Sequence, residues 1–250
     1  MARPRSELAT LADLLRDFGA EGWTEDAAER VFDLIADRSR ALFNSYVEIA
    51  EAVAKVIEGG VLTLPLVLRR LLLGAHLTLF NEVFVNAGQV RQAGDPGGSH
   101  VYFGGHRGQR RTMRFTGLPA DQIDAALDAA FARLEDWRDD TSGSSVGERA
   151  RDAAILFYAD LSRIHPFYDG NGRTGRLIVS VYLHLHGWLV DWAQIDEREG
   201  RFMRKINDVN EKKSAATDYE AFLLRFWAKY VERTDTLEPP ADPAPPNDDA

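Results

Sequence analysis

The sequence predicts an all-α fold, and two observations carry the prediction. Most of the chain repeats apolar residues with the spacing of an amphipathic helix, and glycine, proline and capping residues interrupt that spacing where helices commonly end. At 250 residues and 45% hydrophobic content, the chain is long enough to enclose a site that excludes water. The predicted helices cover about residues 6–17, 24–58, 64–86, 121–136, 146–164, 171–186, 197–209 and 218–230.

Three of these helices lie in the N-terminal part of the chain. The first is expected to end at Gly19. The second begins at Thr24, a residue type suited to an N-cap, followed by acidic residues that favour the positive end of the helix dipole. It is predicted to run without a break to Gly59. The third, residues 64–86, carries a stripe of leucine and phenylalanine on one face.

A glycine-rich stretch between residues 89 and 119 breaks the helical pattern. Two short β-prone runs flank its central glycines and predict a β-hairpin over about residues 100–116. It is the one clear strand signal that we find in the sequence. The hairpin is also basic, with arginines at positions 107, 110, 111 and 114. Such a surface suits either solvent or an acidic partner.

The net charge of −9 argues against a nucleic-acid or anionic-membrane binder, which would carry a basic excess. Residues 234–250 hold five acidic residues, five prolines and no Lys or Arg, so residues 1–233 carry only −4 of the charge. This composition predicts a disordered tail outside the fold.

The sequence has no cysteine, which excludes disulfides, thiolate nucleophiles and cysteine-ligated metals. The first residues lack the apolar core of a secretory signal, and the most apolar stretch, residues 62–79, contains two central arginines. We therefore expect a packed helix there, no membrane association and a cytoplasmic location. Delivery into a host cell stays open.

The segment with the clearest chemistry is residues 165–176, HPFYDGNGRTGR, between two strongly helical stretches. Pro166 disfavours helical geometry at His165, so the preceding helix is expected to end there. Gly170, Gly172 and Gly175 let main-chain N–H groups approach a ligand where the next helix begins. A glycine-rich loop that leads into a helix N-terminus is typical of an anion site.

The charged residues of this segment suit a nucleotide. Arg173 and Arg176 are one turn apart and have forked donors for phosphate oxygens. Asp169 could hold Mg²⁺ against a di- or triphosphate. His165 can accept a proton near neutral pH. Together they indicate transfer of a nucleotide-derived group to a hydroxyl.

Each residue taken alone has a simpler interpretation. A His-Pro pair at a helix end is more often structural, and arginine pairs usually lie on solvated faces. Their coincidence with three glycines within six residues favours a site, because glycine weakens a helix and is otherwise unexpected there. Phe167 is expected to anchor the loop in the core, and Tyr168 receives no role.

The segment resembles the signature of the Fic family, H-x-F-x-[D/E]-G-N-G-R-x-x-R, at every specified position. Residues 75–80 and 86–91, AHLTLF and NAGQVR, are similar to the upstream helix of that family and its Gly-x-x-Arg ending. The predicted hairpin falls where Fic proteins carry a target-docking flap. The resemblance implies a Fic-like helical bundle in residues 62–233, a helical extension in residues 1–61, and the tail in residues 234–250.

The resemblance also implies an activity: transfer of AMP from ATP to a Ser, Thr or Tyr hydroxyl of a target protein. His165 would deprotonate the hydroxyl and Asp169 would hold Mg²⁺. The loop of Gly170, Asn171 and Gly172 would cradle the α- and β-phosphates, with Gly175 part of the same signature. Arg173 and Arg176 would bind the β- and γ-phosphates.

Several alternatives stay open at this point. Gly172 favours AMP transfer over the Doc-like kinases, which have Lys there, but transfer of UMP, phosphate or phosphocholine uses similar signatures. A nucleotide-binding, toxin-like module controlled by a partner is a further alternative. Many Fic proteins inhibit themselves through an [S/T]-x-x-x-E-[G/N] helix whose Glu pairs with the second arginine, here Arg176. No complete copy is present; Glu21-Gly22 is the nearest. Either a separate inhibitory protein acts, or this device is absent.

Overall fold

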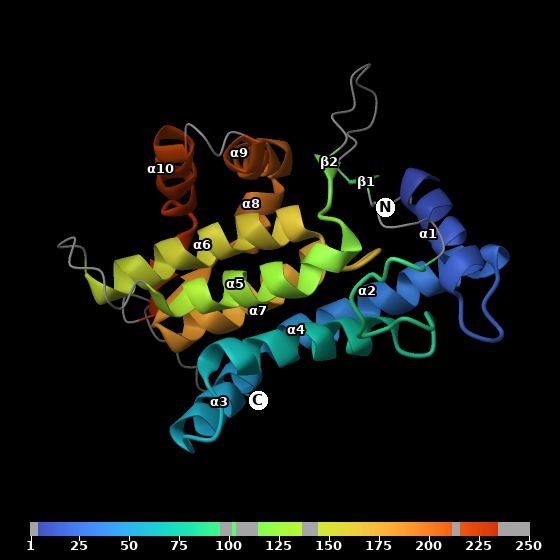
Figure 1. The fold of residues 1–250 in the computed structure, drawn as a ribbon, viewed down its shortest axis with the longest axis horizontal. Coiled ribbons are helices and arrows are strands. Elements are labelled where there is room, and N and C mark those ends of the chain that lie inside the picture. Colours follow the sequence, from blue (N-terminus) through green and yellow to red (C-terminus); the bar gives the residue numbers. More distant parts are fainter. Residues whose placement is uncertain (1–4, 96–101, 104–114, 137–144, 212–215, 235–250) are drawn as a thin grey trace, which may run out of the picture.

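The computed structural model describes residues 5–95, 102–103, 115–136, 145–211 and 216–234, and in them the all-α prediction is confirmed. The helices are α1 (Arg5–Phe18), α2 (Ala28–Asn44), α3 (Tyr46–Glu58), α4 (Leu64–Phe80), α5 (Ile123–Asp136), α6 (Val146–Ile164), α7 (Asn171–Leu185), α8 (Trp192–Asp196), α9 (Glu199–Glu211) and α10 (Ala216–Trp227), with short 3₁₀ turns η1 (Glu25–Ala27) and η2 (Ala120–Gln122). Figure 1 shows α5, α6 and α7 side by side in the middle, with α3 and α4 on one side and α8 to α10 on the other.

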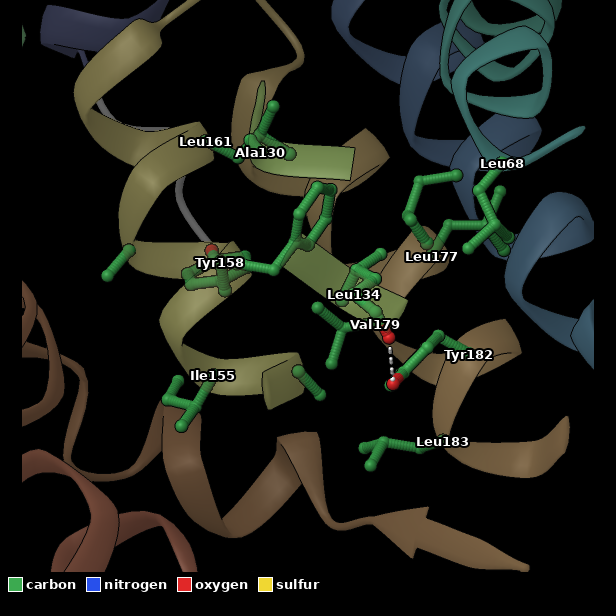
Figure 2. Close-up of a cluster of buried hydrophobic side chains, with 14 of the residues drawn as sticks. Leu68, Ala130, Leu134, Ile155, Tyr158, Leu161, Leu177, Val179, Tyr182 and Leu183 are labelled. Carbon is green, nitrogen blue, oxygen red and sulfur yellow. Dashed lines mark hydrogen bonds between the residues drawn. The ribbon is translucent and has the colours of Figure 1, made fainter. Parts of the chain in front are cut away.

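Helix α7 lies at the centre of the bundle, packed against α3, α4 and α6. All seven residues from Leu177 to Leu183 are buried, which is the pattern of a helix covered on every side. The surrounding core includes Leu68, Leu134, Ile155 and Leu161 (Figure 2). The hydroxyl of Tyr182 donates to the main-chain oxygen of Leu134 at 2.8 Å, so the polar group of that buried ring is satisfied.

Helix α6 has clear ends. Ser145 and Glu148 form a capping box at its start: the Ser145 hydroxyl accepts from the Glu148 N–H at 3.2 Å, and the Glu148 carboxylate accepts from the Ser145 N–H at 3.1 Å. At its other end Pro166 follows His165, and the helix stops at Ile164 as predicted.

Two helix predictions were wrong in their extent. The single helix of residues 24–58 is divided at Ser45, whose hydroxyl donates to the carbonyl of Ala41 where the chain turns. The helix of residues 64–86 ends at Phe80. Beyond that point the main chain pairs with the N-terminal segment instead: the N–H of Val85 donates to the carbonyl of Phe18, and that of Ala20 to Val83.

The predicted hairpin is confirmed where the structure describes it. Strands β1 (Tyr102–Phe103) and β2 (Phe115–Thr116) pair antiparallel, with Tyr102 opposite Thr116. The basic residues 107, 110, 111 and 114 and the tail after residue 234 lie outside the described residues. A second pair was missed: β3 (Trp188–Val190) pairs antiparallel with β4 (Val231–Arg233), and strands of three residues so far apart in sequence leave little signal.

The N-terminal helices have a core of their own. It joins α1, α2 and the end of α4 through Leu15, Phe18, Val31 and Phe80, and it reaches Tyr168 in the loop after α6. The division between residues 1–61 and 62–233 stays a prediction. No helix of the described residues is long and apolar enough to cross a bilayer.

Candidate functional site

His165 lies at the C-terminal end of α6, in the left-handed conformation with φ of 49°. A ring N–H donates to the main chain of Ser162, so the second ring nitrogen is the acceptor of a neutral imidazole. Burial and, to a smaller extent, the positive charge of Arg91 lower the pKa of His165 to about 3. The ring is therefore neutral near pH 7, the form that a general base requires.

The loop from His165 to Gly170 is closed by its own side chains. The amide of Asn171 accepts from the Phe167 N–H at 3.0 Å and donates to the Phe167 carbonyl at 2.8 Å. Phe167 is 1% exposed, which confirms its predicted role as a core anchor. Gly170 has φ of 78°, and a Cβ there would lie 2.5 Å from the Phe80 ring, so the chain needs glycine at this turn.

The N-terminus of α7 opens beside this loop. Thr174 is the first residue whose N–H reaches a helical acceptor, the carbonyl of Gly170 at 2.9 Å. By helix geometry the N–H groups of Asn171, Gly172 and Arg173 have no acceptor within α7. Gly172 is exposed, and a Cβ added there would have no neighbour nearer than the Tyr158 hydroxyl at 4.0 Å. These donors and the helix dipole form an anion-binding geometry.

Asp169 and Arg173 meet at the mouth of the loop. Oδ1 of Asp169 accepts from the Gly170 N–H at 2.6 Å, and Arg173 lies 3.2 and 3.4 Å from the two carboxylate oxygens. The Arg173 guanidinium also lies over the Phe80 ring at 5.7 Å. Arg173 thus places a positive charge beside the Asp169 carboxylate at the N-terminus of α7.

The donor set suits a Mg²⁺ ion that shares its ligands with a nucleotide. Asp169 supplies a hard oxygen ligand. Because the described residues contain no cluster of three or more potential metal-ligating side chains, an ion here would need further ligands from outside the protein. Mg²⁺ is commonly held by one or two carboxylates together with phosphate oxygens and water. Asp169 therefore fits such an ion, and the ion would draw its remaining ligands from phosphates and solvent.

Arg176 points to a different side of α7 from Arg173. Its terminal nitrogens lie 2.9 and 2.6 Å from the two carboxylate oxygens of Asp196 on α8. The guanidinium also lies 4.9 Å from the centre of the Trp192 ring. Hydrogen bonds to Asp196 and Tyr158 raise the pKa of Arg176 although burial opposes them. Glu21, the nearest match to an inhibitory glutamate, is exposed in the turn after α1.

Gly175 has a packing role. It is buried, and a Cβ there would lie 3.0 Å from Leu161 and 3.1 Å from Tyr158 on α6. Its N–H also lies beyond the first turn of α7, where helical acceptors are present. The structure thus explains this glycine by the close approach of two helices. Contact of Gly175 with a ligand stays a prediction.

Two residues that sequence reasoning left without a role support the loop. His76 accepts from the Gly88 N–H at 2.9 Å, bonds to the main chain of Asp169, and stacks on Phe167 at 3.9 Å. Burial lowers the pKa of His76 to about 3. Tyr168 donates to Asp95 at 3.1 Å and stacks on Phe18 at 4.4 Å. His76 stood in an apolar stripe, which alone indicates only a buried histidine.

Comparison with known proteins agrees with this geometry. The Fic/DOC family model matches residues 67–183, from α4 to α7. The chain therefore contains a Fic domain. The protein adenylyltransferase Fic of Drosophila willistoni is 34% identical over 90 residues, and that of Drosophila ananassae equally so. The matched region is 36% of this chain and 15% of either relative.

Solved structures show the same fold. A Fic family protein from Desulfovibrio desulfuricans has a TM-score of 0.52 at 18% identity, covering 90% of this chain and 62% of that one. A Fic domain containing signaling protein from Bacteroides thetaiotaomicron has a TM-score of 0.51 at 16% identity, covering 78% and 69%. The helical bundle and the hairpin of the described residues are thus Fic-like in fold.

Replacing Gly170 by Ala should lower the free energy of unfolding by at least about 2 kcal/mol. A left-handed L residue costs about 1–2 kcal/mol, and the added Cβ meets the Phe80 ring. Gly172→Ala is the matched control: its Cβ enters open space in a helix, where Ala is favoured by about 0.5–1 kcal/mol. Urea unfolding of both variants measures the difference. Equal stabilities would contradict the strained turn at Gly170.

Stability should fall as the pH decreases from about 6.5 toward 3. The pKa values of His76 and His165 are about 3 in the folded chain and near 6.5 when unfolded, so the unfolded state binds more protons in this range. Between pH 6.5 and 5, above the range of most carboxylates, the slope should approach about 2.7 kcal/mol per pH unit. His165→Gln should remove about half of it in urea unfolding; an unchanged slope would show that His165 titrates normally.

Proposed function

We propose that the chain is a protein adenylyltransferase that moves AMP from ATP to a Ser, Thr or Tyr hydroxyl of a target protein. One observation carries the proposal: a neutral histidine stands at one end of a six-residue loop, and an open helix N-terminus flanked by arginine stands at the other. The names of the Drosophila relatives support adenylyl transfer in particular. The proposed co-substrates are ATP and Mg²⁺.

Main-chain and side-chain groups around the N-terminus of α7 would bind the phosphates of ATP. The N–H groups of Asn171, Gly172 and Arg173 would bind phosphate oxygens at the positive end of α7. Arg173 and Arg176 would bind the outer phosphates and stabilise the charge of the leaving pyrophosphate. Mg²⁺ held by Asp169 would supply further neutralisation of the phosphates. Their positions are set before any ligand binds, because the loop is closed by protein contacts alone.

The proposed reaction is a displacement at the α-phosphorus of ATP by the target hydroxyl, and it needs no third reactant. The target hydroxyl oxygen forms a bond to the α-phosphorus as the bond from that phosphorus to the oxygen leading to the β-phosphorus breaks. His165 accepts the hydroxyl proton, and pyrophosphate leaves. The target segment would dock on the hairpin of β1 and β2, which joins the site at Gly117, where a Cβ would lie 2.9 Å from the Cβ of His165. A separate inhibitory protein is the proposed source of regulation.

Incubation with α-labelled ATP, Mg²⁺ and a cell lysate should label a protein band. His165→Ala should lower the rate by about 10²–10⁴-fold because the general base is lost. His186→Ala, at the far end of α7, is the matched control and should label normally. If the target were labelled by γ-labelled ATP and not by α-labelled ATP, the transferred group would be phosphate. The mass of the modified target distinguishes AMP from UMP and phosphocholine. Equal labelling by His165→Ala would contradict the mechanism.

Asp196→Asn should strengthen ATP binding by up to about fivefold. Asp196 occupies both terminal nitrogens of Arg176, so an outer phosphate has to compete with it. The Asp196 side chain is 52% exposed, and exposed pairs contribute about 0.2–1 kcal/mol, which ATP can overcome. Glu197→Gln, the neighbouring exposed carboxylate, is the matched control. Calorimetric titration with ATP and Mg²⁺ measures the change, and weaker binding would show that Asp196 assists Arg176.

A further inference from the structure

Arg91 is almost completely buried, at 1% exposure, and its donors converge on the end of α6. Its Nε donates to the carbonyl of His165 at 2.9 Å. One terminal nitrogen donates to the carbonyl of Leu118 at 2.8 Å and lies 3.4 Å from that of Ile164. Its main-chain N–H donates to the carbonyl of Pro166 at 2.9 Å. One residue thus binds the last carbonyls of the helix that carries the base.

These contacts account for the main chain around His165. The last carbonyl groups of a helix have no hydrogen-bond partner within the helix. A left-handed residue such as His165 also ends the helical hydrogen-bonding pattern, and this conformation is costly for an L residue. Arg91 satisfies the carbonyls on either side of that residue, and the Leu118 N–H adds a bond to the Ile164 carbonyl at 3.2 Å. Gly117 completes the arrangement, since a Cβ there would lie 2.9 Å from the His165 Cβ and 3.0 Å from Arg91.

The charge of Arg91 has a second effect. The C-terminus of a helix carries partial negative charge, which favours a protonated histidine. The positive guanidinium of Arg91, bound to the same carbonyl groups, opposes protonation of His165. Arg91 is the charged group that acts on the imidazole, and the main chain of Ser162 on α6 accepts a hydrogen bond from the ring. Asp95 and Tyr168 act on the guanidinium of Arg91. Arg91 is the first of these in lowering the pKa of His165 after burial.

We propose that Arg91 is a positioning residue for His165: its guanidinium fixes the main chain of the base in the left-handed conformation and keeps a cation beside the imidazole. The inference deepens the proposed function, on which its catalytic part rests. Arg91 has no contact with the reacting atoms in this scheme. It acts by holding the base in place and by extending to lower pH the range in which the imidazole stays unprotonated.

Arg91→Gln tests the two effects together. The variant loses both the planar guanidinium and its positive charge. The kcat for target labelling should therefore fall about 100-fold, which is the loss expected when a base is displaced by about 1 Å. The KM for ATP should stay within about twofold of the wild-type value. The acid limb of the pH profile should move up by about one pH unit because the helix terminus is no longer opposed. A merely structural residue would lower the melting temperature and move neither kcat nor the acid limb.

Arg91→Lys separates charge from geometry and serves if Arg91→Gln does not fold. It keeps the cation and loses the planar fork, so kcat should fall at least about 10-fold with the acid limb unchanged. The matched control is Arg38→Gln. Arg38 binds the carbonyls of Leu79 and Asn81 at the end of α4 in the same manner, so its loss should cost stability and leave kcat and KM as in the wild type.

An NMR titration of the His165 ring in ligand-free protein distinguishes this inference from the proposed function. The pKa of His165 should rise by about one unit in Arg91→Gln and stay unchanged in Arg91→Lys and Arg38→Gln. If the wild-type protein labels no target, the proposed function fails while this titration still decides the role of Arg91. An Arg91→Gln protein with wild-type kcat, or with an unchanged pKa of His165, overturns the inference.

Discussion

Helix α7 is buried on every side, and the site depends on that constraint. Because Leu177 to Leu183 all lie in the close-packed core, the helix cannot slide or rotate without exposing apolar surface or opening cavities. Its N-terminus is therefore fixed, and the loop from His165 has to reach it from the end of α6. A left-handed glycine at 170 and the amide of Asn171 make that short connection. His165 and the open N–H groups are brought together as a result.

The side chains of the site are held from distant parts of the sequence. Arg91 binds the end of α6, His76 of α4 binds the main chain of Asp169, and Asp196 of α8 binds Arg176. These contacts need no ligand, so the loop is organised in advance. A nucleotide that bound Arg176 would have to displace the exposed carboxylate of Asp196. Phe18 of α1 packs on Tyr168, which ties the N-terminal helices to the same loop.

The sequence predicted much of this because its signals are local. Helical periodicity, Pro166 and the glycines define where α6 ends and α7 begins, and all the motif residues lie within twelve positions. What was missed depends on contacts distant in sequence. The early end of α4 follows from pairing with residues 18–20, and the strands β3 and β4 stabilise each other across some forty residues. The partner of Arg176, twenty positions away, and the packing role of Gly175 likewise follow only from the fold.

The proposed activity requires that the N-terminus of α7 bind the phosphates of a nucleotide. Amide NMR spectra recorded during titration with ATP and Mg²⁺ test it most directly. The amide signals of Asn171, Gly172 and Arg173 should shift together and saturate, while the signals at the N-terminus of α6, which Ser145 already caps, should not. Saturable shifts confined to other helices, or none at all, would contradict the account.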